Sequence, residues 1–171
     1  MAITKKQIYW GIGIGATLIT VGGLIYRHRK KIKKAAKKAE NWIRPVAAKI
    51  SSSFGKRIHP ITKKEIFHNG IDLAIPVNTP IKSPMPGIVY SVISEGDGGN
   101  QVIIKHNNGY KTGYAHLNKA LVEKGDKVAQ GDVIALSGNT GKSTGPHLHF
   151  TLTDPFGAKV DPQKVIYSGV V

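Results

Sequence analysis

The sequence contains no cysteine and few acidic residues. Without cysteine, neither a disulfide bond nor a thiolate metal ligand can contribute to the protein. The 171 residues carry 10 Asp and Glu against 25 Lys and Arg, a formal net charge of +15 at pH 7. Glycine is abundant, and 20 glycines with 9 prolines favour a turn-rich β domain over a helical bundle. The length suffices for one ordinary domain with appendages.

The positive charge is concentrated in residues 27–44, which carry nine Lys and Arg and one acid, Glu40. We expect a basic helix here that ends before Pro45, because the residue before a proline disfavours the helical conformation. Next to a membrane, such a run is attracted to anionic lipid headgroups. Nucleic acid binding is less favoured, since nothing in the run would read bases.

Residues 8–26 form an uncharged, largely apolar run that is long enough to cross the hydrocarbon core at about 1.5 Å per residue. A cleaved signal peptide is the alternative. It is disfavoured because a basic stretch, and not a small-x-small cleavage site, follows the run. The sequence therefore predicts a single transmembrane helix at 8–26, followed by a basic juxtamembrane helix and linker at 27–50.

From residue 51 onward, short β-branched and apolar runs alternate with turns that contain glycine, asparagine and aspartate. This pattern predicts a mainly β domain at 51–168, either an antiparallel sheet or a compact sandwich. The expected strands include Gly87–Ile93, Gln101–Lys105, Tyr110–Ala115, Val133–Leu136 and His147–Thr153.

Histidine and aspartate occur in two short motifs that are far apart in the sequence, His68-Asn-Gly-Ile-Asp72 and His147-Leu-His149. Even spacing in an extended segment places both members of a motif on one face, and Gly70 permits the backbone to bend. Hydrolytic zinc sites usually have three nitrogen or oxygen ligands and one water molecule. The motifs therefore predict a zinc site in which one histidine of the second motif binds the metal and the other stands beside the water.

Three other features are compatible with binding but favour structural roles. Ser137–Ser143 is similar to a phosphate-binding loop, but Leu136 occupies the position of the required first glycine. We interpret this segment as a turn that leads into the second histidine motif. His59 and His106 each lack a partner at ligand spacing, and His28 lies in the basic run, where it is expected to be solvated.

Six stretches in residues 51–168 resemble the lysostaphin-type (LytM-like) zinc endopeptidases, which cut peptide cross-links in bacterial cell walls. They are Ser53–Pro60, Phe67–Leu73, Gly99–His106, Gly113–Leu117, Gly125–Val128 and Ser143–Phe150. The resemblance assigns one zinc ion to His68, Asp72 and His149, and it makes His116 and His147 the unliganded active-site histidines. No HExxH glutamate is present, so the histidine pair would transfer protons in an order that the sequence leaves open.

The substrate that the resemblance implies is a peptide bridge of peptidoglycan, which suits an open groove on a β sheet. One departure is Thr151, where the family commonly has glutamate after the HLHF sequence. This change affects hydrogen bonding around His149 but removes no ligand. A non-catalytic peptidoglycan-binding or structural membrane protein is the alternative, and it is disfavoured because all five expected site residues are present.

The location of the catalytic domain raises a conflict. Eight Lys and Arg between Arg27 and Lys38 follow the span, against Lys5 and Lys6 before it. The positive-inside rule then leaves the domain in the cytoplasm, away from assembled peptidoglycan. A bacteriophage virion with an internal membrane would resolve the conflict. The alternative is a bacterial inner-membrane enzyme that faces the periplasm against the rule. The oligomeric state is not predicted.

Overall fold

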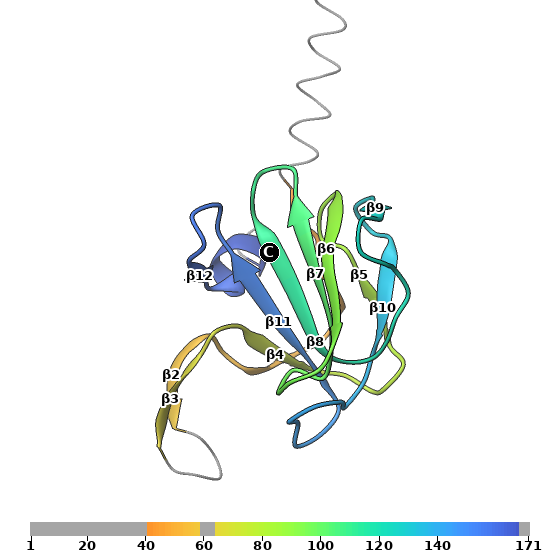
Figure 1. Cartoon of the computed structure of the whole chain (residues 1–171). Helices are drawn as coiled ribbons and strands as arrows, with labels where there is room; N and C mark the ends of the chain where they lie inside the picture. Colours follow the sequence, from red (N-terminus) through yellow and green to blue (C-terminus); the bar gives the residue numbers. More distant parts are fainter. Residues whose placement is uncertain (1–40, 59–63, 168–171) are drawn as a thin grey trace, which may run out of the picture. The chain divides into compact units, whose positions relative to one another are not determined.

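Antiparallel β strands form most of the regular structure in residues 41–58 and 64–167, which are the residues that the computed structural model describes (Figure 1). The elements are β1 (Ile50–Ser52), β2 (Gly55–Ile58), β3 (Glu65–His68), β4 (Ile71–Ala74), β5 (Pro80–Lys82), β6 (Gly87–Ser94), β7 (Asn100–His106), β8 (Lys111–Ala120), β9 (Lys127–Val128), β10 (Val133–Ser137), β11 (His147–Thr153), β12 (Lys159–Val160) and a short helical turn, η1 (Gln163–Tyr167). The expected mainly β, antiparallel architecture is confirmed, and the five strands named from the sequence overlap β6, β7, β8, β10 and β11.

The main sheet has the strand order β1-β4-β11-β8-β7-β6-β9, with β5, β10 and β12 joined at its sides. Its central strands alternate between core and functional side chains. The fully buried members of β4 and β11 are Ile71, Leu73, Leu148, Phe150 and Leu152. Burial of each such side chain contributes about 1.5–3 kcal/mol. Because neighbouring residues of a strand face opposite ways, Asp72, His147 and His149 lie together on the other face.

Strand β8 bends at His116. Residues up to Ala115 pair with β11, whereas residues from Leu117 onward pair with β10. At the bend, His116 has a φ of 61°, in the left-handed region that non-glycine residues rarely adopt. Its backbone N–H donates to the carbonyl of Gly98 at 2.8 Å. The bend therefore fixes the backbone of His116 at the edge of the functional face.

His68 and Asp72 do not share one strand, and the bend that Gly70 permits separates them. His68 ends β3 in the separate β2–β3 hairpin, which Figure 1 shows projecting to one side, and Asp72 lies in β4 of the main sheet. The chain bends between them at Gly70. A Cβ atom there would lie 2.4 Å from the backbone oxygen of Phe150. Glycine is thus required because the turn lies directly against β11.

The residues that precede β1 belong to the same compact unit. The Trp42 ring packs edge-on against His106 and Tyr110, with ring centroids 5.2 and 5.8 Å apart. The backbone N–H of Ile43 donates to the carbonyl of Pro84 at 3.1 Å. The unit therefore begins at Trp42, ahead of the boundary expected at residue 51.

The predicted transmembrane helix at 8–26 lies outside the described residues, and so do residues 27–40 of the predicted linker. His28 and His59 also lie outside them. Within 41–58 and 64–167, no helix has both the length and the hydropathy that crossing a bilayer requires.

Candidate metal centre

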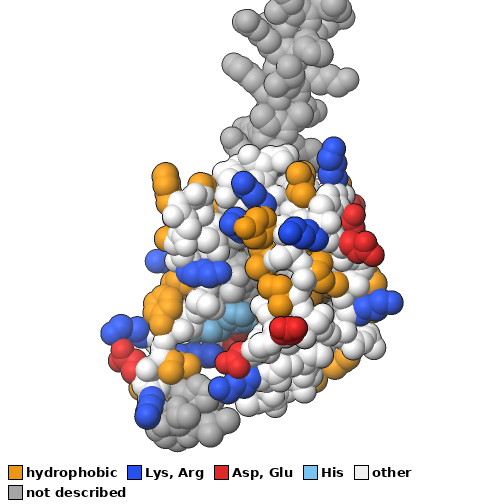
Figure 2. Space-filling model, viewed as in Figure 1, with side chains coloured by type: hydrophobic (Ala, Val, Ile, Leu, Met, Phe, Trp, Pro, Cys, Tyr) orange, Lys and Arg blue, Asp and Glu red, His pale blue; other side chains and the backbone are white. Residues whose placement is uncertain are grey.

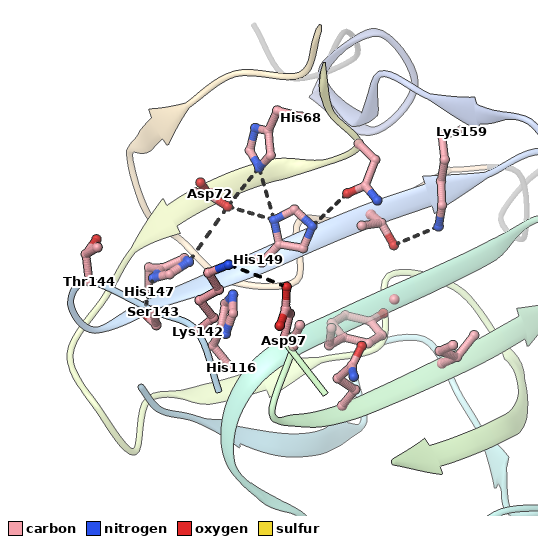
Figure 3. A pocket seen from close by; sticks show the side chains of 18 of the residues that line it. His68, Asp72, Asp97, His116, Lys142, Ser143, Thr144, His147, His149 and Lys159 are labelled. Atoms are coloured by element: carbon pink, nitrogen blue, oxygen red, sulfur yellow. Dashed lines mark hydrogen bonds and ion pairs between the residues drawn. The ribbon is translucent and has the colours of Figure 1, made fainter. Parts of the chain in front are cut away.

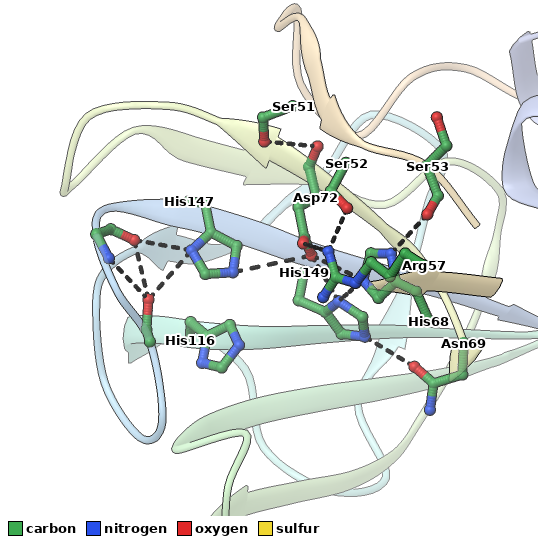
Figure 4. Close-up of polar contacts among 12 residues, drawn as sticks. Ser51, Ser52, Ser53, Arg57, His68, Asn69, Asp72, His116, His147 and His149 are labelled. Atoms are coloured by element: carbon green, nitrogen blue, oxygen red, sulfur yellow. Dashed lines mark hydrogen bonds and ion pairs between the residues drawn. The ribbon is translucent and has the colours of Figure 1, made fainter. Parts of the chain in front are cut away.

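Asp72 and His149 are direct cross-strand neighbours in β4 and β11. Nδ1 of His149 lies 2.7 Å from Oδ1 of Asp72, and Nε2 of His68 lies 3.1 Å from each of these two atoms (Figure 4). The structure thus brings together the three residues predicted as ligands, although they come from three different strands.

Each of the rings of His68 and His149 has an inner nitrogen that faces Asp72 and an outer nitrogen that points away from it. Each outer nitrogen lies next to a hydrogen-bond acceptor. Nδ1 of His68 lies 2.8 Å from the carbonyl oxygen of Ser53, which can only accept, so this nitrogen carries the hydrogen. Nε2 of His149 lies 3.0 Å from Oδ1 of Asn69. In the neutral rings, the inner nitrogens therefore present lone pairs to Oδ1 of Asp72. Three converging lone pairs repel one another unless a cation lies among them.

This donor set fits zinc. Zinc binds imidazole nitrogen and carboxylate oxygen at about 2.0–2.2 Å, and tetrahedral geometry then separates ligand atoms by roughly 3.3–3.5 Å. The ligand atoms of His68, Asp72 and His149 all lie within 4.8 Å of one another, and their hydrogen-bond distances of 2.7–3.1 Å need only a small outward shift to admit the ion. Three protein ligands leave a fourth position for water, as catalytic zinc sites require.

Asp72 is held in its ionised form. When the two rings are protonated instead of neutral, burial acts to raise the pKa of Asp72, but the hydrogen bonds that His149 and His68 then donate and the positive charge of the rings outweigh burial and bring this pKa far below the ordinary value. Arg57 faces the other carboxylate oxygen, with Nη1 3.4 Å from Oδ2, and it also donates to the hydroxyl of Ser52 (Figure 4). Asp72 therefore offers one oxygen to the metal and one to a guanidinium.

His147 stands beside the ligand cluster without belonging to it. Its Nδ1 lies 2.8 Å from the carbonyl oxygen of Gly145 and 3.1 Å from the hydroxyl of Ser143. Because the carbonyl only accepts, Nδ1 carries the hydrogen, and Nε2 is left as an acceptor. Nε2 lies 3.8 Å from Oδ1 of Asp72, next to the donors.

His116 faces His147, with ring centroids 4.6 Å apart. Its Nδ1 donates to the carbonyl of Thr140 at 2.8 Å, which leaves Nε2 as the acceptor. Burial is the main cause that lowers the pKa of His116, so the neutral ring is favoured. The hydroxyl of Thr140 donates to Leu117 at 2.7 Å and accepts from the backbone of Asn100 at 3.0 Å. The turn interpreted as leading into the second motif thus also positions His116.

The five residues predicted for the site line one open groove of about 550 Å³ across β8 and β11 (Figure 3). In Figure 2 the histidine side chains lie at the bottom of a hollow in the surface. Next to them the floor is formed by Gly113 on β8, opposite Thr151 on β11. A Cβ atom on Gly113 would lie 2.6 Å from Oγ1 of Thr151. Glycine at this position therefore leaves room for the Thr151 side chain in the floor of the groove.

Three residues that contact the metal ligands were not predicted from the sequence: Ser53, Arg57 and Asn69. Their only signal was proximity to the first motif, since two of them lie in the stretch Ser53–Pro60 and Asn69 follows His68. His106 is not among the groove residues. It is buried, and its Nε2 accepts a 2.8 Å hydrogen bond from the hydroxyl of Thr112, as its expected structural role requires.

Known proteins resemble a large part of this chain. Peptidoglycan DD-endopeptidase ShyA of Vibrio cholerae is 50% identical over 111 residues, which are 63% of this chain and 26% of that protein. The chain therefore spans about a quarter of the length of this relative. A zinc-containing peptidase of Vibrio cholerae superimposes with a TM-score of 0.64 and 42% identity, over 71% of this chain and 38% of the other.

The catalytic domain of lysostaphin from Staphylococcus simulans also has a TM-score of 0.64, with 31% identity over 71% of this chain and 93% of that domain. The model of peptidase family M23 matches residues 66–162, which include all five predicted site residues. The metal-donor geometry, the fold and this match agree, and the chain belongs to peptidase family M23.

Proposed function

We propose that the chain is a zinc endopeptidase that hydrolyses peptide cross-links of bacterial peptidoglycan. The observation that carries the proposal is the convergence of three lone-pair donors in an open groove, beside two further histidines that are not needed as ligands. The relative ShyA is named a peptidoglycan DD-endopeptidase, which supports this substrate class.

The side chains around the donors are suited to proton transfer. Zinc, when bound, polarises a carbonyl and lowers the pKa of a bound water. Nδ1 of both His116 and His147 is committed to a backbone carbonyl, so Nε2 of either neutral ring can accept the proton of the attacking water. The imidazolium that forms can then give this proton to the leaving amine. The first step uses a neutral histidine, in agreement with the lowered pKa of His116.

Digestion of purified peptidoglycans that differ in cross-bridge chemistry tests this function. The full chain, purified with zinc, should release soluble fragments whose masses identify the cleaved bond. A matched His149→Ala protein should release none. Failure to degrade any cross-linked peptidoglycan would overturn the proposal.

A non-catalytic peptidoglycan-binding or structural protein is the rival function, and zinc content separates the two. A peptidase purified from cells should carry about one zinc ion per chain. An adaptor should carry none, and its biological effect should survive the His149→Ala substitution.

We further propose that residues 8–26 anchor the chain in a bilayer and that residues 27–44 contact anionic headgroups. The charge distribution supports a domain on the cytoplasmic side and thus carriage in the internal membrane of a virion for cell-wall penetration during entry. A periplasm-facing enzyme of the bacterial inner membrane is the alternative. Protease treatment of intact spheroplasts that express the full chain distinguishes them, because only a periplasm-facing domain would be digested from outside.

A further inference from the structure

Three cationic side chains line the groove, and one of them differs from the others. Arg57 faces Asp72 at 3.4 Å, and Lys142 faces Asp97 at 3.9 Å. Lys159 has no carboxylate within 4 Å among the described residues, and its Nζ lies 3.5 Å from the hydroxyl of Thr151.

The surroundings of Lys159 contain further positive charge. Burial is the main cause that lowers the pKa of Lys159, and the positive charge of the nearby Lys111 lowers it further. The ammonium of Lys111 itself lies 4.4 Å from the centroid of the Tyr90 ring. A carboxylate at position 151 would neutralise Lys159, but this chain has threonine there. An anion that enters the groove would therefore gain a charge-assisted hydrogen bond with little competition from the protein.

The position of Lys159 relative to the metal donors is set by β11. Thr151 lies two residues beyond His149 on the same face of the strand, at about 3.4 Å per residue, hence roughly 7 Å away. Figure 3 shows Lys159 beyond His149, on the opposite side from His147. A peptide that lies extended along the groove advances at a similar rate. A group that contacts Lys159 is thus about two residues from the scissile bond.

We propose that Lys159 forms a subsite for a free carboxylate of the substrate, about two residues from the bond that is cleaved. This inference rests on the proposed peptidase function and narrows its substrate class to cross-linked peptides that carry a carboxylate near the scissile bond. The carboxylate can be the α-carboxylate of a chain end or that of an internal, branched residue.

The test uses cross-linked muropeptides in which the carboxylates near the scissile bond are either free or converted to amides. Two mono-amides, one at the chain end and one at the internal residue, identify the source of the carboxylate. The full chain should hydrolyse the free form with a kcat/KM roughly tenfold higher, the scale of one hydrogen bond between charged groups. Lys159→Met should bring this ratio to about one, and Lys159→Glu should reverse it.

Lys142→Met is the matched control, since it removes a groove lysine that already has a carboxylate partner. It should keep the wild-type ratio, and zinc content and melting temperature should show that each variant is folded. A wild-type ratio of one, or an equal loss in Lys142→Met, would overturn the inference alone. If the wild type cleaves neither muropeptide nor intact peptidoglycan, the proposed function fails, and the inference fails with it.

Discussion

Arg57 and Asp72 are joined through the carboxylate oxygen that faces away from the metal donors. Nη1 of Arg57 lies 3.4 Å from Oδ2 of Asp72, while Oδ1 lies within 3.1 Å of the inner nitrogens of His68 and His149. The guanidinium therefore fixes the orientation of the carboxylate without competing for its ligand oxygen. Such outer contacts commonly set the affinity of a metal site.

Replacing Arg57 by methionine should weaken zinc binding by roughly 10–100-fold, because Asp72 would lose the partner that orients it. Competition with a zinc-chelating dye measures this affinity. Lys56→Met is the control from the same hairpin, since Lys56 is exposed and, among the described residues, its only ion pair is with Glu65 at 2.8 Å. Equal zinc affinity in wild type and Arg57→Met would show that Arg57 does not support the site.

Measurement of zinc content should distinguish substitutions of the three metal ligands from substitutions of the two unliganded histidines. Alanine at His68, Asp72 or His149 should remove the zinc, since each supplies one of three donors. Alanine at His116 or His147 should leave zinc bound and lower kcat by roughly 10²-fold or more, as expected for a lost acid–base group. Zinc content and turnover are measured on the same preparations. Loss of zinc in His147→Ala with retention in His149→Ala would reverse the assignment within the second motif.

His106 should make the free energy of unfolding depend on pH. Burial lowers its pKa below the ordinary value of 6.5, against the opposing effect of the Pro86 and Met85 carbonyls. Above pH 6.5 the ring is neutral in both states. As the pH falls through 6.5, the unfolded chain takes up the proton first, so stability decreases by at most about 1.4 kcal/mol per pH unit until the folded-state pKa is passed.

Urea unfolding of wild type and His106→Gln at several pH values measures this contribution. The difference between the two proteins isolates His106, because the site histidines are present in both. The wild type should lose more stability on acidification than the variant. Parallel pH profiles would exclude a lowered pKa at His106.

The left-handed conformation of His116 predicts an unusual order of stability. Glycine normally destabilises a strand relative to alanine, but at a φ of 61° the Cβ atom of alanine is strained. His116→Gly should therefore be more stable than His116→Ala by about 1 kcal/mol in thermal or urea unfolding. The same pair of substitutions at Lys119, which lies on β8 beyond the bend, should show the opposite order.

The sequence predicts the strands, and it predicts that His147 and His149 share one face of their strand. Both predictions depend on the local alternation of apolar and polar residues. In β11, His147 and His149 lie on one face and buried apolar side chains lie on the other, and the alternating sequence of the strand shows this pattern. The first motif was harder. His68 reaches Asp72 through a bend and a separate hairpin, so the juxtaposition depends on Gly70 lying against β11, a tertiary contact.

The roles of Arg57 and Thr140 could not be predicted for the same physical reason. Each acts through a contact between segments that are distant in the sequence, Arg57 with β4 and Thr140 with the bend of β8. The bend itself is also difficult to predict, because only a few per cent of non-glycine residues have a positive φ and histidine is only several-fold enriched among them. Alternation thus reveals which residues share a face, while strand pairing decides which of them meet.

The turn between β10 and β11 orients two of the five histidine and aspartate side chains of the site. The carbonyls of Thr140 and Gly145 in this turn orient the rings of His116 and His147. The rings of His68 and His149 are oriented instead by Ser53 and Asn69, which lie outside the turn. The orientation of the two unliganded histidines thus depends on a turn that is not needed to orient the metal ligands, although His147 and His149 share strand β11. If the proposed function holds, substitutions in this one turn would lower turnover while leaving the three metal ligands in place, which would convert a hydrolase into a non-catalytic zinc-binding protein.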